Sequence, residues 1–180
     1  MVLTRGSTDV ALPGGAKRTN ERRLRRSYEA GHHPKLLVLV DEGPDCDKAV
    51  YYAARRAARI GAIVTLLRVI DTDYGEIGWL TITDLMRSEA QELLAKYVQR
   101  VQDVAILSPE TLVREGDPAQ QILNVIQDDE DIAILVLAAG STEIGPSALV
   151  SSLARTAGTY PIPIVIVPTH LSERELDGLS

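Results

Sequence analysis

Short strand-like runs alternate with segments of helical periodicity through most of the sequence. Runs at residues 36–40, 62–70, 110–115, 132–139 and 162–167 predict β-strands. The run 132–139 is apolar at every position, which is typical of a strand at the centre of a parallel sheet covered by helices on both sides. The last run begins at Ile162, ends at Val167 and contains Pro163, which cannot donate a ladder hydrogen bond. We therefore expect the last strand at an edge of the sheet.

The segments between these runs have the apolar spacing of amphipathic helices, at residues 46–60, 84–104, 118–127 and 147–157. In the first segment, Val50, Ala53, Ala54 and Ala57 share one helical face, and their small side chains suit a helix that lies close to a sheet. Residues 71–85 are expected to form a long loop. This alternation predicts an α/β fold with a doubly wound sheet of five parallel strands and helices on both faces.

Length and composition divide the chain into one domain and two tails. A chain of 180 residues suits one ordinary α/β domain, which we expect over residues 34–169. Residues 1–33 combine Gly, Pro, Ser and Thr punctuation with an excess of basic residues, so they predict a flexible basic arm. Residues 170–180 are expected to form a C-terminal tail.

Charge and composition argue against several classes of function. The net charge is −6. Because the arm is basic, the domain itself is acidic, which disfavours nucleic acid as a partner. The sequence has no apolar run of about 18 residues and no secretion signal, so we expect no membrane segment. The single cysteine, Cys46, fits a reducing compartment and a cytoplasmic location. Three histidines and one cysteine lack metal-ligand spacing, so no metal site is predicted.

Polar residues after two predicted strands are candidates for ligand binding, because open α/β sheets bind ligands at the carboxyl ends of strands. Asp41 ends the first strand, and its carboxylate could bind a ligand or cap its own loop. The loop after the fourth strand is rich in hydroxyl groups, which could bind a nucleoside or small anion or could cap a helix. These hydroxyls belong to Ser141, Thr142, Ser147, Ser151 and Ser152. No Cys/His pair or G-x-S-x-G motif is present, so no catalytic residue is predicted.

Four segments of the sequence resemble the universal stress protein family. They are LLVLVDEGPDCDKAVYYAARRAARIGAIVTLLRVI, VREGDPAQQIL, DIAILVLAAGS and YPIPIVIVP, in this order. The resemblance implies an adenine nucleotide alpha hydrolase-like fold with strand order 3-2-1-4-5. It also implies a homodimer through the last strand, residues 162–167, in a family that contains both ATP binders and proteins that do not bind ATP.

The loop after the fourth strand departs from the ATP binders of that family. Those proteins share an Asp after the first strand, which Asp41 matches, and a residue beside adenine, which Val69 matches. They also share a G-x-x-G-x9-G-[ST] loop. Aligned without gaps, its three glycines and its hydroxyl residue correspond to Ala138, Ser141, Ser151 and Ser152. A one-residue shift replaces the last two by Val150 and Ser151, and Gly140 is out of register. Side chains at such positions crowd the approach of a triphosphate to the backbone.

The sequence therefore predicts a dimeric, non-enzymatic protein of the stress response, or a regulatory protein, with weak or no ATP binding. The alternative is an adenine-nucleotide-binding protein, for ATP or AMP, with at most slow ATP hydrolysis. In both cases the candidate ligand contacts are Asp41, Val69, Ala138, Gly140, Ser141, Ser151 and Ser152.

Overall fold

The computed structural model describes residues 24–71, 79–140 and 148–180, and for residues 79–83 it describes the backbone alone. In this part of the chain, five strands form one sheet of order β3-β2-β1-β4-β5. The strands are β1 (Lys35–Leu39), β2 (Ile63–Ile70), β3 (Glu110–Glu115), β4 (Ile132–Ala138) and β5 (Ile164–Val167). Every pairing between neighbouring strands is parallel, which confirms the predicted α/β sheet and its strand order.

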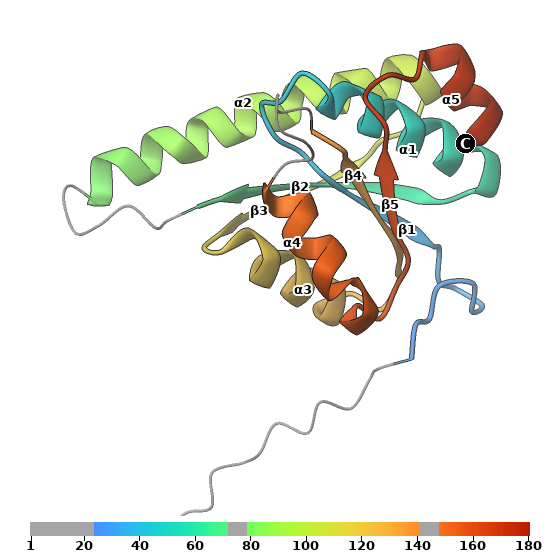
Figure 1. Ribbon diagram of the computed structural model, residues 1–180, viewed down its shortest axis with the longest axis horizontal. Helices are drawn as coiled ribbons and strands as arrows, with labels where there is room; N and C mark the ends of the chain where they lie inside the picture. Colours follow the sequence, from blue (N-terminus) through green and yellow to red (C-terminus); the bar gives the residue numbers. More distant parts are fainter. Residues whose placement is uncertain (1–23, 72–78, 141–147) are drawn as a thin grey trace, which may run out of the picture.

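Helices cover both faces of the sheet (Figure 1). The helices are α1 (Cys46–Ile60), α2 (Trp79–Ala105), α3 (Pro118–Asp128), α4 (Ala148–Thr156) and α5 (Glu173–Leu179), with a short 3₁₀ turn, η1 (Ala157–Thr159), after α4. Helices α1, α2 and α5 lie on one face, and α3 and α4 lie on the other. In the described part of the chain, no helix is both long enough and apolar enough to cross a membrane.

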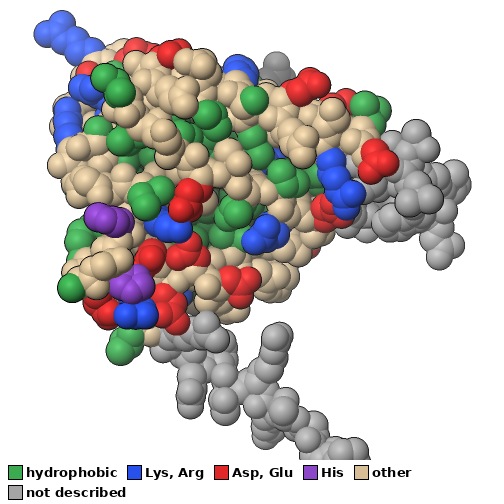
Figure 2. Space-filling view, turned by 180° about the vertical axis from the view of Figure 1, so that it is seen from behind, with side chains coloured by type: hydrophobic (Ala, Val, Ile, Leu, Met, Phe, Trp, Pro, Cys, Tyr) green, Lys and Arg blue, Asp and Glu red, His purple; other side chains and the backbone are tan. Residues whose placement is uncertain are grey.

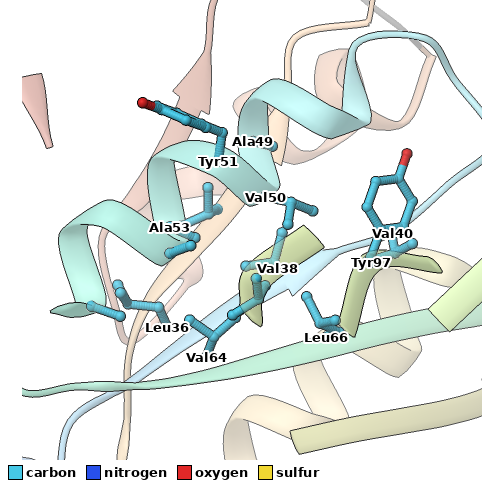
Figure 3. Packing of buried hydrophobic residues seen from close by; sticks show 14 of the residues in the cluster. Leu36, Val38, Val40, Ala49, Val50, Tyr51, Ala53, Val64, Leu66 and Tyr97 are labelled. Atoms are coloured by element: carbon cyan, nitrogen blue, oxygen red, sulfur yellow. The ribbon is translucent and has the colours of Figure 1, made fainter. Parts of the chain in front are cut away.

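The core on the first face is formed by the alanine-rich side of α1. Ala49, Ala53, Ala54 and Ala57 are fully buried there. In Figure 3, Ala49, Val50 and Ala53 of α1 lie against β1 and β2, where Val38, Val64 and Leu66 are labelled. Small side chains allow this close approach of the helix backbone to the sheet. Gly61 then ends α1 in the left-handed conformation (φ 66°), and its N–H donates to Ala57 O.

The core on the second face is formed by α3 and α4. Ile122 and Ile126 of α3 and Leu153 of α4 pack against alternate side chains of the central strands. Leu37, Leu67 and Leu135 supply that layer from β1, β2 and β4. Burial of each large aliphatic side chain contributes about 1.5–3 kcal/mol to folding. The central strands are therefore held from both sides, and their carboxyl ends are rigidly placed.

Two boundaries differ by more than one residue from those that the sequence predicts. Strand β5 begins at Ile164 rather than Ile162, because Pro163 has no N–H to donate, although its carbonyl accepts a hydrogen bond from Leu135 N at 3.0 Å. Helix α2 begins at Trp79, within the predicted loop 71–85. The β-branched residues near its start cost only a few tenths of a kcal/mol each, less than the penalty for starting a helix afresh.

The C-terminal tail folds into α5. The hydroxyl of Ser172 accepts a hydrogen bond from Glu175 N, and the Glu175 carboxylate accepts one from Ser172 N at 2.8 Å, which together form a capping box. Leu176 is almost fully buried and packs into the core cluster beneath α1.

Arginines of α1 and α2 bind α5 to the domain. Arg55 of α1 donates to Asp177 of α5 at 2.7 Å. Arg100 of α2 pairs with Asp47 of α1 at 2.9 Å and also with Glu173 of α5. The tail is thus part of the folded domain on the α1 face.

The segment before β1 contacts the end of α3. The guanidinium Nη1 of Arg25 donates to the carbonyls of Ile126 and Asp129, at 2.5 and 2.9 Å. The last carbonyls of a helix lack partners within it and carry partial negative charge, so a cation there stabilises the helix end.

The acidic turn after α3 is also paired with basic side chains. His32 Nδ1 lies 2.7 Å from Asp131 Oδ1. Lys35 Nζ lies 3.0 Å from Asp129 and 2.9 Å from Glu110 of β3. Figure 2 shows acidic, basic and histidine side chains gathered at one end of the molecule. The acidic turn, which includes Asp129 and Asp131, is therefore held by these pairs against the segment that leads into β1.

Candidate functional site

A pocket of about 440 Å³ lies at the carboxyl ends of β1 and β2. The ends of these strands supply most of its walls, and α2, α3 and α4 supply the remainder. Its apolar lining consists of Leu39, Val40, Val69, Ile70, Met86, Pro118 and Leu149. Its charged lining consists of Asp41, Glu42, Arg68, Asp71 and Glu89. The pocket thus combines an apolar interior with a strongly acidic border.

Asp41 reaches the pocket through the turn that follows β1. One carboxylate oxygen, Oδ1, accepts a hydrogen bond from Gly43 N at 2.8 Å. A Cβ at Gly43 would also lie 2.8 Å from that oxygen, so this turn requires glycine. The second oxygen, Oδ2, has no hydrogen-bond partner among the residues that the structure describes. Asp41 therefore caps its own loop and retains one acceptor oxygen at the pocket.

Val69 lies on β2 with its side chain in the core layer under α3 and α4, and it lines the same pocket as Asp41. Strands β1 and β2 are parallel neighbours, with Leu39 opposite Leu67, so their carboxyl ends meet at one edge. The structure thus brings Asp41 and Val69 together.

The other sequence-predicted candidates do not line this pocket in the described part of the chain. Ala138 is the last residue of β4 and packs near the α1 face of the core. Gly140 follows in the left-handed conformation (φ 64°). Ser151 and Ser152 lie inside α4, and Ser152 O accepts a hydrogen bond from Thr156 Oγ1 at 3.2 Å. Ser141 lies outside the described residues.

Arg68 is a residue of the pocket that sequence reasoning misses. Its Nη2 donates to Glu42 Oε1 at 2.8 Å. The Arg68 side chain is 23% exposed and the Glu42 side chain is 75% exposed, so the pair lies at the mouth of the pocket. Arg68 Nε is buried and has no hydrogen-bond partner among the described residues. Its place two residues before the end of β2, beside strand β1 that leads to Asp41, is the signal that could have identified it.

Cys46 lies close behind this turn but has no chemical role in the pocket. It is 1% exposed, and its Sγ lies 3.9 Å from Leu39 O. Burial raises the pKa of the thiol, so it stays protonated at neutral pH and is a poor nucleophile. Burial likewise raises the pKa of the neighbouring Tyr97. Among the described residues, no group of three or more His, Cys, Asp and Glu side chains could hold a metal ion.

The parallel sheet covered by helices on both faces, with a pocket at the carboxyl ends of its strands, defines a doubly wound α/β domain. Residues 33–168 match the model of the universal stress protein family. The chain therefore belongs to the universal stress protein family. No curated protein matches the sequence.

Solved structures of the family share this fold at low sequence identity. The universal stress protein UspA from Lactobacillus plantarum is 20% identical, with a TM-score of 0.65, and the match covers 76% of this chain and 98% of that one. A universal stress protein in complex with cAMP is 17% identical, with a TM-score of 0.56 and coverage of 77% and 98%. The universal stress protein from Archaeoglobus fulgidus in complex with dAMP is 18% identical, with a TM-score of 0.51 and coverage of 74% and 97%.

Proposed function

We propose that this protein is a cytoplasmic, homodimeric regulator of the stress response that catalyses no reaction and binds ATP weakly or not at all. The observation that carries the proposal is the charge of the pocket. Among the described residues, Asp41, Glu42, Asp71 and Glu89 supply four carboxylates to its lining, and Arg68 supplies the one guanidinium. A triphosphate carries several negative charges, and carboxylates at short range repel it.

The chemistry of the lining supports a role without catalysis. The described residues around the pocket include no histidine, cysteine, serine or lysine. Nucleophilic catalysis needs a nucleophile beside a base, and the nearby thiol of Cys46 is buried and protonated. Regulation through a bound ligand or a partner needs neither group.

Adenine-nucleotide binding is the second candidate function. The pocket volume of about 440 Å³ is within the range of small-molecule sites, about 300–1,000 Å³. Val69 offers an apolar wall for a base, and Asp41 Oδ2 offers an acceptor for a hydroxyl or amino group. Two universal stress proteins of the same fold are described in complex with cAMP and dAMP. This candidate includes at most slow ATP hydrolysis.

Calorimetric titration with Mg-ATP and with AMP tests both candidates. We expect little or no heat with Mg-ATP, and binding of AMP supports the second candidate. Asp41→Ala should then abolish the heat of AMP binding, whereas Asp103→Ala, an exposed acid on α2, should leave it unchanged. Tight binding of Mg-ATP would contradict the leading proposal.

Dimerisation through β5 is the quaternary part of the proposal. Strand β5 pairs with β4 and lies at the edge of the sheet, and its Ile166 is 39% exposed. An edge strand with an exposed apolar side chain favours pairing with a second copy. Ile166→Lys should give monomers in analytical ultracentrifugation, while Ile106→Lys, at a 93% exposed position before β3, should not. A dimer that survives Ile166→Lys would exclude this interface.

A further inference from the structure

Strand β3 forms one edge of the sheet, where its only neighbour among the described residues is β2. Successive residues of a strand point their backbone N–H and C=O groups to opposite sides, so only every second residue bonds to a given neighbour. Gly116 N, directly after β3, donates to Ile70 O of β2 at 2.9 Å, so every second residue before it also points toward β2. Thr111, Val113 and Glu115 therefore present their backbone groups at the free edge.

An uncharged groove lies beside this free edge. It has a volume of about 450 Å³ and is formed by α2 and β3. Ala95 and Val98 of α2 and Thr111 and Val113 of β3 are among the residues that line it, and none of its described lining residues carries a charge. Exposed positions elsewhere on α2 include charged residues such as Glu92. The side of α2 next to the edge is therefore better suited to burial against protein than the rest of the helix.

Two copies of β3 fit together in antiparallel through this edge when Leu112 of one copy lies opposite Leu112 of the other. Thr111 and Val113, which both point outward, then form hydrogen-bonded pairs with Val113 and Thr111 of the second copy. On the face of the strand away from the groove, Glu110 lies opposite Arg114 of the second copy. The two-fold symmetry repeats this contact, so the register contains two ion pairs.

The contacts of Arg114 agree with such a partner. Among the described residues, its guanidinium forms no ion pair, and Nη1 donates to Val113 O, a carbonyl of the free edge, at 3.1 Å. Glu110 lies on the same side of the strand, and its side chain is 44% exposed although Lys35 Nζ binds it at 2.9 Å. Charged side chains on an edge strand usually oppose pairing with another strand. Here the two charges are complementary, so they select a register instead.

The neighbouring antiparallel register lacks these ion pairs. It places Val113 opposite Val113 of the second copy, so that Arg114 lies opposite Leu112 and Glu110 lies opposite Gly116. The pairing centred on Leu112 is therefore the one that the charges of β3 favour.

Helix α2 extends the contact above the paired strands. A two-fold axis perpendicular to the sheet keeps α2 of both copies on the same face, and α2 contacts both β2 and β3. Because neighbouring strands lie about 4.8 Å apart, two helices above the last two strands of their sheets come within about 10 Å of each other, a distance at which helices pack. The uncharged side of α2, with Ala95 and Val98, then faces the second copy.

We propose that the free edge of β3 and the adjoining side of α2 form a self-association surface that binds a second copy of this chain in antiparallel, centred on Leu112. This surface lies at the opposite edge of the sheet from β5, so it is separate from the dimer proposed above. Interfaces below about 1,200 Å² associate weakly. One short strand and one side of a helix form a small interface, so the β3 contact requires a high protein concentration.

Analytical ultracentrifugation of the Ile166→Lys chain tests the surface, because this variant lacks the proposed contact through β5. We expect monomers in dilute solution and dimers as the protein concentration rises. Association should weaken as the salt concentration rises, because salt screens exposed ion pairs. Circular dichroism checks that each variant is folded.

Arg114→Glu, added to this chain, places two carboxylates opposite each other at both ends of the pairing. It should weaken association at least about tenfold, because two attractive cross-strand contacts become repulsive. Arg155→Glu makes the same change of charge at an exposed position in the last turn of α4 and should leave association unchanged.

Single cysteine substitutions map the centre of the pairing. Leu112→Cys should form a disulfide-linked dimer under mild oxidation, because the Cα atoms of a non-hydrogen-bonded antiparallel pair lie about 4.5 Å apart, within the range that disulfides span. Thr111→Cys and Val113→Cys should form little, because neither position lies opposite itself. The native Cys46 is 1% exposed, and the unsubstituted chain gives its background. Non-reducing electrophoresis measures the linked fraction.

The outcomes separate this surface from the β5 interface. Cross-linking through Leu112→Cys does not depend on β5, so it supports the β3 surface even if the β5 dimer proves wrong. Cross-linking through Val113→Cys instead, or association that Arg114→Glu leaves unchanged, would overturn the proposed register. If the Ile166→Lys chain stays monomeric at every concentration and Leu112→Cys does not cross-link, the inference fails, and the edge is left to an extended peptide of another protein.

Discussion

The two ends of the sheet differ in how their acidic groups are balanced. At the amino end, Asp129 and Asp131 lie against the basic side chains of Lys35 and His32. At the carboxyl end, the described residues that line the pocket include four carboxylates and one arginine, and that arginine pairs with Glu42. The paired charges at the amino end hold segments of the fold together, whereas the pocket at the carboxyl end has more carboxylates than cations in its described lining.

Lys35 illustrates the balanced end. Burial alone would lower the pKa of its ammonium, but hydrogen bonds to Glu110 and Asp129 outweigh burial and raise it. The side chain is only 16% exposed, so it joins β1, β3 and the acidic turn in partly desolvated surroundings. Such a group contributes to stability through all of its partners together.

The largest expected effect is the loss of Lys35. Lys35→Met leaves Glu110 and Asp129 without their shared cation, and we expect the free energy of unfolding to fall by about 2 kcal/mol. Arg68→Met removes one cation from the other end and should cost less than about 1 kcal/mol, because its partner Glu42 is exposed to water. Urea unfolding of both variants measures the difference. Equal losses would show that the two ends do not differ as the geometry indicates.

A smaller effect is expected where the N-terminal segment caps α3. Arg25→Ala removes the donor to the Ile126 and Asp129 carbonyls and should destabilise the end of α3 by about 1 kcal/mol. Arg26→Ala is the matched control, because the Arg26 side chain pairs with the exposed Glu29 and not with α3 among the described residues. Amide hydrogen exchange in the last turn of α3 should be faster in the first variant and unchanged in the second. Equal exchange in both variants would mean that Arg25 does not cap the helix.

Most of the fold could be predicted from the sequence because local periodicity and burial agree. Helix α1 and strand β3 have the predicted bounds, since the apolar spacing of α1 and the turn residues around β3 leave little ambiguity. The start of α2 could not be predicted, because an existing helix extends at a low cost through residues that would not start one. The start of β5 shows the local effect of Pro163.

The candidate site was less predictable, because its parts come from separate strands. Asp41 follows from its place at the end of the first predicted strand and Val69 from the family resemblance, and the structure places both at the pocket. Arg68 is marked in the sequence only by its place near the end of β2, and its pairing with Glu42 is seen only in the folded chain. The basic partners of the acidic turn could not be predicted from the sequence either. Asp131 and His32, for example, are far apart in the chain and meet only after folding.

The smallest expected effect is a pH-dependent loss of stability in α5, where two exposed carboxylates, Asp177 and Glu175, accept hydrogen bonds. It tests whether such pairing stabilises structure even in contact with water. The hydrogen bond from Arg55 lowers the pKa of Asp177, and hydrogen bonds from Ser172 lower the pKa of Glu175. Groups whose pKa is lowered by folding stabilise the fold above their unfolded pKa, and this contribution is lost as the pH falls through the lowered value. Amides of α5 should therefore lose protection relative to those of α1 as the pH falls below about 4.

Asp177→Asn separates this pairing from a general effect of acid on the domain. The variant should show weakened protection of α5 already at neutral pH and a smaller further loss in acid, because it has no carboxylate to protonate at this position. Asp103→Asn, at an exposed position on α2, should behave like the wild-type protein. If wild-type α5 keeps its protection at low pH while α1 loses it, the pairs with α5 contribute nothing measurable, and pairing stabilises structure only where water is partly excluded, as at Lys35.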